Sequence, residues 1–257
     1  MTRLVIVGGG RMGEALLGGL LSAGWSPADL AVVEPVHDRR KALAPYEGVT
    51  VSADPVRAEG AVIAVKPADV AAAVTACNAS RILSIAAGVT TAALETAAGD
   101  GVPVVRAMPN TPALVGAGVA AIAGGTAATD DDLAWAESIL GAVGTVVRVP
   151  EHLLDAVTGL SGSGPAYVFL VVEALVEAGV LVGLPRPVAV ELAHQTVLGA
   201  ARLLVESGEA PDTLRAMVTS PGGTTAAGLA ELERHGVRAA FLEAVSAATA
   251  RSKELGS

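Results

Sequence analysis

A glycine-rich turn near the amino terminus constrains the fold of this chain more than any other feature. The turn, Gly8-Gly9-Gly10-Arg11-Met12-Gly13, directly follows the apolar run Leu4–Val7 and leads into a segment with helical spacing, Met12–Leu21. Between a strand and a helix, G-x-G-x-x-G is typical of a dinucleotide site. Its glycines permit a tight turn, close approach of the backbone to a pyrophosphate at the helix amino terminus, and close helix–strand packing. We therefore predict that a dinucleotide is bound by Gly8, Gly10, Arg11, Met12 and Gly13.

Strand-like and helix-like segments alternate through the first 150 residues. Strands are expected at Leu4–Val7, Leu30–Glu34, Ala61–Val65, Arg81–Ile85 and Val102–Arg106, with shorter ones near Val119–Ala123 and Thr145–Val149. Continuous apolar strands that alternate with helices are typical of a parallel sheet covered on both faces. The sequence therefore predicts an α/β protein with a doubly wound domain over residues 1–150.

After about Glu151 the strand candidates fade and long helical patterns follow. These lie at Pro165–Val182, Pro187–Ser207, Pro211–Val218, Thr224–His235 and Val237–Glu254. The segment Pro165–Val172 is apolar on almost every side, as in a helix buried in a core or against another subunit. We expect an all-α domain over residues 151–257 that forms a dimer interface, and only the last few residues look loose.

Composition and charge exclude several classes of protein. Hydrophobic residues make up 52% and charged residues 17% of the chain, which excludes a disordered protein. The net charge of −9 argues against a nucleic-acid-binding surface. No membrane-spanning segment is expected, because Glu173 and Glu177 interrupt the apolar stretch Pro165–Pro185. The first residues run straight into a strand without the pattern of a signal peptide, so we expect a cytoplasmic location.

Metal and disulfide chemistry are not expected. Cys77 is the single cysteine, which excludes an intrachain disulfide and a cysteine-cluster metal site. The four histidines are scattered and lack the short spacing with which one helix ligates a metal. We therefore predict no metal site.

The residue that ends the second predicted strand bears on the choice of dinucleotide. Glu34 lies roughly 20 residues past Gly13, where a carboxylate would bind the adenosine ribose 2′-hydroxyl of NAD and repel the 2′-phosphate of NADP. Arg39 and Arg40 follow closely and could reach that phosphate instead, and Glu34 could also be a solvated strand end. These residues alone do not decide whether the cofactor is NAD or NADP.

Two other strand ends carry polar residues where ligands bind in open α/β sheets. Lys66 follows the strand Ala61–Val65, and it is either a binding residue or a surface strand cap. Asn110 follows the strand Val102–Arg106 and offers both a donor and an acceptor to a carboxamide, although a structural turn is an equally good interpretation.

In the second half, Ser220-Pro221-Gly222-Gly223-Thr224-Thr225 leads into a helix. The free N–H groups and the partial positive charge of a helix amino terminus favour a carboxylate or phosphate. Gly222 and Gly223 begin this anion-binding segment, which we call the cradle. Ser220, Thr224 and Thr225 add hydroxyls that could position a polar ring substituent. The alternative is a capped helix start. With a dinucleotide turn upstream, the cradle indicates a redox enzyme whose substrate carries a small anion.

At these residues the chain resembles the pyrroline-5-carboxylate reductase family, which catalyses the last step of proline synthesis. The resemblance covers essentially the whole chain. Its segments are Gly8–Leu16, Ala64–Pro67, Ala86–Val89, Met108–Pro112, Asp155–Tyr167 and Ser220–Thr225. The last two, in this order and spacing, are the most specific.

The resemblance implies a Rossmann domain followed by a helical domain that intertwines with a partner subunit, often within decamers built from dimers. It implies that Ser220 and backbone amides near Gly223–Thr225 hold the substrate carboxylate, while Thr225, the catalytic candidate, hydrogen-bonds the ring nitrogen. Glu34 differs from the small polar residue that NADPH-preferring members of the family tend to carry at this position. The choice between NADPH and NADH as cofactor therefore stays open. The residues implied to line the cofactor are Ala64, Val65, Lys66, Pro67, Ala86, Ala87 and Gly88.

The expected chemistry is hydride transfer from nicotinamide C4 to the C=N carbon of 1-pyrroline-5-carboxylate. A β-hydroxyacid dehydrogenase is one alternative, but it needs a catalytic lysine on a helix of the second domain, and only Lys253 follows Lys66. A dinucleotide sensor without turnover is another. It would need an output surface, and the sequence has neither a basic DNA-reading helix nor an appended domain.

Overall fold

The computed structural model describes residues 2–256, which divide into two compact units. One unit comprises Met1–Ser163 together with Ser246–Ser257, and the other comprises Gly164–Val245. The division lies beyond the boundary expected after residue 150, and the end of the chain belongs to the first unit. We describe each unit by itself.

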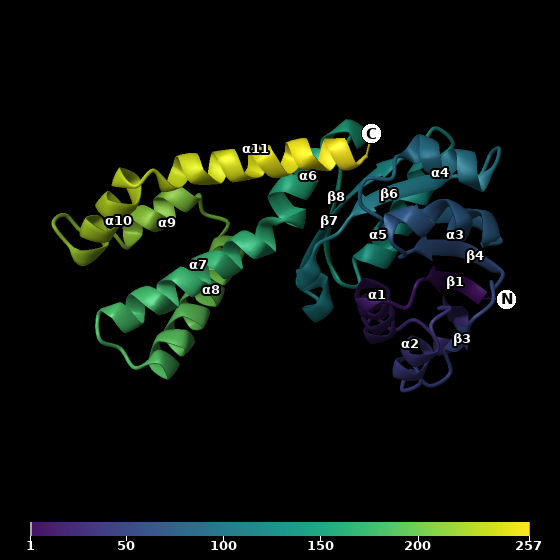
Figure 1. The fold of residues 1–257 in the computed structure, drawn as a ribbon, viewed down its shortest axis with the longest axis horizontal. Coiled ribbons are helices and arrows are strands. Elements are labelled where there is room, and N and C mark those ends of the chain that lie inside the picture. The colour runs from purple at the N-terminus through teal and green to yellow at the C-terminus, as the bar shows by residue number, and fades with distance from the viewer. Residues whose placement is uncertain (1, 257) are drawn as a thin grey trace. The chain divides into compact units, whose positions relative to one another are not determined.

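The first unit contains an eight-stranded sheet with the order β3-β2-β1-β4-β5-β6-β7-β8 (Figure 1). Neighbouring strands are parallel, except that β6 and β7 are antiparallel. The chain reverses its direction of growth between β1 and β4, and such a switch point is where open α/β sheets bind ligands. The strands are β1 (Thr2–Val7), β2 (Leu30–Val33), β3 (Thr50–Ser52), β4 (Ala58–Ile63), β5 (Ala79–Ser84), β6 (Val104–Met108), β7 (Gly118–Gly124) and β8 (Gly144–Arg148).

Helices cover both faces of this sheet because its central strands are apolar on both sides. Leu4 and Ile6 of β1 face one core cluster, which includes side chains of α1 and α5, while Val5 faces a second cluster with side chains of α3 and α4. The predicted α/β class is confirmed. The helices of this layer are α1 (Arg11–Ser22), α2 (His37–Ala42), α3 (Val70–Ala76), α4 (Thr91–Ala98) and α5 (Asp130–Leu140).

Short helical turns connect these elements and lead out of the sheet. They are η1 (Pro27–Asp29), η2 (Pro67–Asp69), η3 (Thr111–Val115), η4 (Glu151–Leu153), α6 (Leu154–Val157) and the π-turn η5 (Thr158–Gly162). Leu154 of α6 is fully buried beside Ala121 and Ala123 of β7. This contact fixes the start of the predicted helical half on the sheet.

The second unit is helical, as the sequence predicts, and its apolar side chains are largely exposed. Its helices are α7 (Gly164–Leu181), α8 (Arg186–Ser207), α9 (Pro211–Met217), α10 (Thr224–Arg234) and the first part of α11 (Val237–Leu255). The buried side chains of the α7–α8 pair are Val176, Ala189 and Ala193, which pack together. Phe169 and Leu170 are 61% and 65% exposed. Two helical stretches, Glu151–Leu181 and Arg186–Ser207, are long and apolar enough to cross a membrane by length and composition alone.

The end of the chain differs from the sequence expectation. The last few residues look loose in sequence, but α11 continues to Leu255, and Ser252 in its last turn is buried. A hydrogen bond from Ser252 and contacts with the Gly88 loop hold this turn on the first unit.

Candidate functional site

The glycine turn is built so that each motif glycine meets a different constraint. Gly8 has φ +108°, and an added Cβ would lie 2.6 Å from the Ala64 carbonyl oxygen. At Gly13 an added Cβ would overlap the Gly8 carbonyl oxygen, so only glycine lets α1 begin this close to β1. Gly10 is the N-cap of α1, and an added Cβ there would have open space around it. The predicted pyrophosphate position at Gly10 is therefore sterically open.

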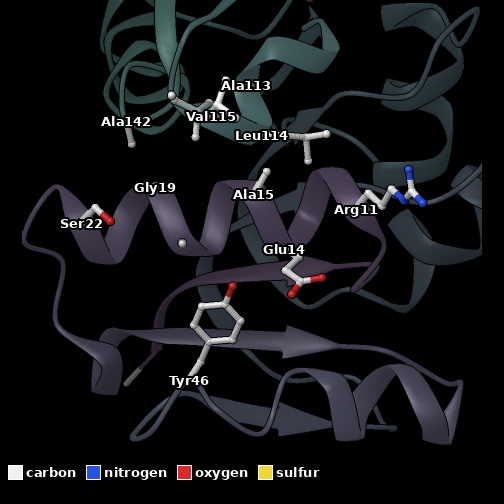
Figure 2. A pocket seen from close by; sticks show the side chains of 13 residues that line it. Arg11, Glu14, Ala15, Gly19, Ser22, Tyr46, Ala113, Leu114, Val115 and Ala142 are labelled. Carbon is white, nitrogen blue, oxygen red and sulfur yellow. The ribbon is translucent and has the colours of Figure 1, made fainter. Parts of the chain in front are cut away.

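Arg11 and Met12, which complete the motif, have side chains in different surroundings. Met12 packs against the core under α1. Arg11 is exposed and lines a pocket of about 490 Å³ together with Glu14, Tyr46 and residues of η3, shown along α1 in Figure 2. Partial burial, together with the charge of Glu14, raises the pKa of Tyr46, so its hydroxyl stays protonated. Arg11 is the one predicted site residue that lines this pocket.

Charged side chains hold the Gly9 peptide from both sides. The Gly9 N–H donates to Glu34 Oε2 at 2.9 Å, and the Val36 N–H donates to Glu34 Oε1 at 2.8 Å. On the other side, Arg39 Nε donates to the Gly9 carbonyl oxygen at 3.0 Å, and Arg39 Nη2 pairs with Glu14 Oε2 at 2.8 Å. Glu34 thus braces the glycine turn from its position at the end of β2.

Arg40 also has internal partners. Its Nη1 donates to the carbonyl oxygens of Glu34 at 2.8 Å and Pro35 at 2.6 Å. The two arginines that could reach a 2′-phosphate are therefore both engaged with protein groups. Sequence reasoning missed this arrangement, because nothing in a run of residues shows which carbonyl an arginine will contact.

A largely apolar cavity of about 210 Å³ adjoins the glycine turn at the switch point. It lies among the carboxyl ends of β1, β2 and β4, and is lined by residues that include Val7, Gly8, Val33, Val65 and Cys77. Burial raises the pKa of the Cys77 thiol. The thiol is therefore neutral at pH 7 and acts as a small apolar wall.

Lys66 and Asn110 both lie at strand ends, as predicted, but only Lys66 is exposed. Asn110 is buried, and its amide oxygen accepts from the Val119 N–H at 2.9 Å while its amide nitrogen donates to the Ser161 carbonyl oxygen at 3.1 Å. Its two functional groups thus connect the loop after β6 to β7 and η5. A contact between Asn110 and a cofactor carboxamide stays a prediction.

A second cavity, of about 340 Å³, gathers two of the segments implied to line the cofactor. Pro67, Ala87 and Gly88 lie along it. Part of its remaining wall is Thr158 and Ser163, from the segment Asp155–Tyr167 that the sequence singled out. The rest comes from residues of α11 that the sequence did not single out: Ala248, Arg251, Ser252 and Leu255. The last turns of α11 are therefore part of this site.

A partly buried ion pair holds the start of α4, which follows the loop Ala86–Gly88. Arg106 of β6, 7% exposed, pairs with Glu151 at 3.0 Å, and Glu151 also accepts from the Thr91 N–H at 2.7 Å and the Thr91 hydroxyl at 2.6 Å. Burial of Glu151 raises its pKa, but the hydrogen bonds from Thr91 and the charge and hydrogen bond of Arg106 outweigh this and lower the pKa overall. The ionised carboxylate thus fixes the start of α4.

The predicted anion cradle lies in the second unit, at the start of α10. Gly222 has φ +70°, and the Gly223 N–H donates to the Ser220 carbonyl oxygen at 3.0 Å to close the turn. Gly223 is the N-cap of α10 and lacks a side chain, so no side-chain cap occupies this helix start. The N–H groups of the first turn precede the first helical bond, which Ala227 donates to Gly223, and they are available to an anion.

The predicted site residues thus fall into two sets. The cofactor candidates belong to the first unit, and Ser220–Thr225 belong to the second. Within residues 2–256, no group of three or more His, Cys, Asp or Glu side chains is placed to hold a metal ion.

Comparisons with known proteins divide the chain in a similar way. The family described as pyrroline-5-carboxylate reductase dimerisation matches residues 151–255, and the family described as NADP oxidoreductase, coenzyme F420-dependent, matches residues 3–88. A pyrroline-5-carboxylate reductase of Mycobacterium tuberculosis is 48% identical, over 99% of this chain and 97% of its own length.

Solved structures agree with these matches. A pyrroline-5-carboxylate reductase of Coxiella burnetii superposes with a TM-score of 0.93 and 36% identity, covering 100% of this chain and 99% of that one. A pyrroline carboxylate reductase of Plasmodium falciparum with NADP bound gives a TM-score of 0.84 and 29% identity, over 100% and 98% of the two chains.

Proposed function

This chain belongs to the pyrroline-5-carboxylate reductase family, and we propose that it reduces 1-pyrroline-5-carboxylate to L-proline with a nicotinamide dinucleotide. One observation carries the proposal. An open glycine turn at a sheet switch point occurs in the same chain as an uncapped helix amino terminus that can hold a small carboxylate. These are the two binding functions that the reaction requires.

The residues fit a dinucleotide. Gly10 leaves space at the amino terminus of α1 for the pyrophosphate, and a Cβ at Gly8 would clash with the Ala64 carbonyl oxygen. The apolar cavity at the ends of β1, β2 and β4 has the character that an adenine ring requires. The second cavity reaches Pro67, Ala87 and Gly88, which the resemblance implies to line the cofactor. When bound, the reduced dinucleotide supplies the hydride that converts the C=N carbon into a CH₂ group.

The chain's own contribution is to hold the imino acid. We propose that N–H groups at the start of α10 and the Ser220 hydroxyl bind the carboxylate, since anions are stabilised at helix amino termini by about 0.3–1 kcal/mol from the dipole alone. The Thr225 hydroxyl would accept the N–H of the protonated imine, which stays on the nitrogen of the product. Because protonation already makes the carbon electrophilic, orientation is the main task, and orientation is worth up to about 7–11 kcal/mol.

We further propose that Glu34 lowers the preference of the enzyme for NADPH over NADH. Its buried carboxylate lies at the end of β2, and Arg39 and Arg40 are already engaged with main-chain carbonyl groups. Replacing Glu34 by Ser should raise kcat/KM with NADPH relative to NADH. Glu34→Gln is the matched control for shape, because it removes the charge and keeps one acceptor for the Gly9 N–H. An unchanged cofactor ratio in both variants would remove Glu34 from selectivity.

The assembly that we propose is a homodimer formed through the helical unit, with a decamer built from such dimers as the larger form. The support is the exposure of large apolar side chains on α7 and α8, whose family match is a dimerisation domain. A partner subunit, rather than lipid, would cover these faces, and we propose a cytoplasmic location on that basis. Sedimentation of the protein without detergent tests this, and recovery only with membranes would contradict it.

The direct test of the reaction is oxidation of NADPH or NADH by the purified chain in the presence of 1-pyrroline-5-carboxylate, with L-proline measured as the product. The proposal predicts one proline formed for each dinucleotide oxidised. Dinucleotide binding without turnover would instead favour a sensor.

A further inference from the structure

We propose that the last turn of α11 is a positioning element of the cofactor site, held there by a hydrogen bond from Ser252 to Asp155. The inference rests on the proposed function in one respect, namely that the cavity along Pro67, Ala87 and Gly88 receives part of the dinucleotide. It adds a structural role for two residues that the reaction itself does not use.

Ser252 is the buried residue of α11, 7% exposed, in a helix whose other described side chains reach the surface at least in part. A buried hydroxyl needs a partner, because an unsatisfied one is destabilising. Ser252 Oγ donates to Asp155 Oδ1 at 2.7 Å, across 97 residues of sequence. Hydrogen bonds from a hydroxyl to a carboxylate are among the stronger ones in proteins. This bond therefore fastens the end of α11 to α6.

The fastened turn contacts the Gly88 loop backbone to backbone. Gly88 has φ +77°, and an added Cβ there would lie 3.3 Å from the Leu255 carbonyl oxygen. An added Cβ at Gly256 would lie 2.9 Å from the Gly88 carbonyl oxygen. Any displacement of the turn therefore acts directly on the main chain of the loop.

The same turn also closes one side of the cavity. Ala248, Arg251, Ser252 and Leu255 line the cavity of about 340 Å³ that Pro67, Ala87 and Gly88 also line. Since the wall and the loop both depend on where the helix ends, releasing Ser252 should enlarge the site and let the loop move. The expected consequence is weaker dinucleotide binding.

The test uses the full chain, four single-substitution variants and the double variant Ser252→Ala/Asp155→Ala. Ser252→Ala and Asp155→Ala remove the bond, Asp155→Asn keeps an acceptor oxygen, and Ser246→Ala repeats the serine substitution at an exposed position of the same helix. The dissociation constant for NADPH is measured by nicotinamide fluorescence, and amide hydrogen exchange of residues 84–90 is measured without cofactor.

We expect Ser252→Ala and Asp155→Ala each to weaken NADPH binding about tenfold, as the loss of a charge-assisted hydrogen bond would give. The double variant should be no weaker than either single one. Exchange in residues 84–90 should rise in the same variants, while Asp155→Asn should largely restore binding and Ser246→Ala should match the wild type. The KM for the imino acid should stay unchanged.

Wild-type NADPH affinity in Ser252→Ala would overturn the proposal. So would faster exchange throughout the first unit with no preference for residues 84–90, because that result describes a general loss of stability. If Ser252→Ala does not fold, failure of Asp155→Asn to exceed Asp155→Ala in affinity overturns it equally. The proposed reaction fails separately, through absence of turnover in the wild-type protein that still binds NADPH.

Discussion

Replacing Glu151 by Ala should destabilise the first unit because it leaves the buried guanidinium group of Arg106 without its ion-pair partner. Glu151 is the side chain that pairs with Arg106, whose own side chain is only 9% exposed. The same carboxylate accepts two hydrogen bonds from Thr91 at the start of α4. The substitution therefore removes three interactions and leaves a guanidinium group without its partner in a site that solvent barely reaches.

The magnitude follows from these contacts. Removing one member of a fully buried ion pair costs about 3–5 kcal/mol. Because the Glu151 side chain is 31% exposed and water partly compensates, we expect the lower end of that range, about 3 kcal/mol. For a unit of this size, that corresponds to a fall in Tm of about 6–12 °C.

The assay is thermal unfolding followed by circular dichroism at one protein concentration, because dissociation of an oligomer also shifts Tm. The matched control is Glu137→Ala, which breaks a two-point pair with Arg148 on the surface, at 2.6 and 2.9 Å. Solvent screens that pair, so the control should change Tm much less. Equal shifts for the two variants would refute the reasoning.

The pH dependence gives an independent check on Glu151. Its pKa is lowered in the folded protein, so the unfolded chain binds the proton more readily, and stability rises with pH in the range where only the unfolded form is protonated. The contribution is complete above the unfolded pKa of about 4.3 and is lost as pH falls through the folded value. Glu151→Gln should remove this part of the acid-induced loss of stability, and an identical acid profile would contradict the assignment.

Three further outcomes are expected. Gly13→Ala should prevent stable folding of the turn and lower Tm, because the new Cβ overlaps the Gly8 carbonyl oxygen. Gly10→Ala should leave Tm unchanged and weaken dinucleotide binding measured by fluorescence. A larger fall in Tm for Gly10→Ala than for Gly13→Ala would contradict this. Phe169→Asp, at an exposed apolar position of α7, should yield monomers in sedimentation, while Glu173→Gln should not, and an intact dimer in both would place the interface elsewhere. Thr225→Ala should lower kcat/KM about 10- to 1000-fold, which overlaps the lower part of the roughly 10²–10⁴-fold range for a positioned acid–base group, because the ring N–H loses its acceptor. Wild-type kinetics in this variant would exclude that role.

The sequence predicts the sheet well where its strands are fully buried. Runs such as Leu4–Val7 and Ala61–Ile63 are continuous and apolar because both of their faces are covered, and they lie in β1 and β4. The predicted strand Ala61–Val65 extends two residues beyond the end of β4. β3, Thr50–Ser52, was not predicted, because three residues at the sheet edge carry no such pattern. The antiparallel direction of β7 could not be predicted from the sequence either, since an apolar run has the same pattern in either direction.

The site could be predicted as a set of segments but not as a set of contacts. The glycine turn could be predicted from the sequence because the steric constraints on each of its glycines come from nearby residues. The bonds that join Glu34 to Gly9 and Ser252 to Asp155 span 25 and 97 residues, and they depend on how distant elements pack. The partners of Asn110 also depend on packing: its amide oxygen accepts from the Val119 N–H, and its amide nitrogen donates to the Ser161 carbonyl oxygen. Its contact with a cofactor carboxamide stays a prediction.

The most direct test of the central claim follows the hydride itself. The enzyme is incubated with 1-pyrroline-5-carboxylate and NADPH or NADH that carries deuterium at the transferred position of nicotinamide C4, and the proline formed is examined by NMR. The account predicts one deuterium at C5 of L-proline, the former C=N carbon, with none at other ring carbons. Proline without deuterium, or no proline at all, would contradict it.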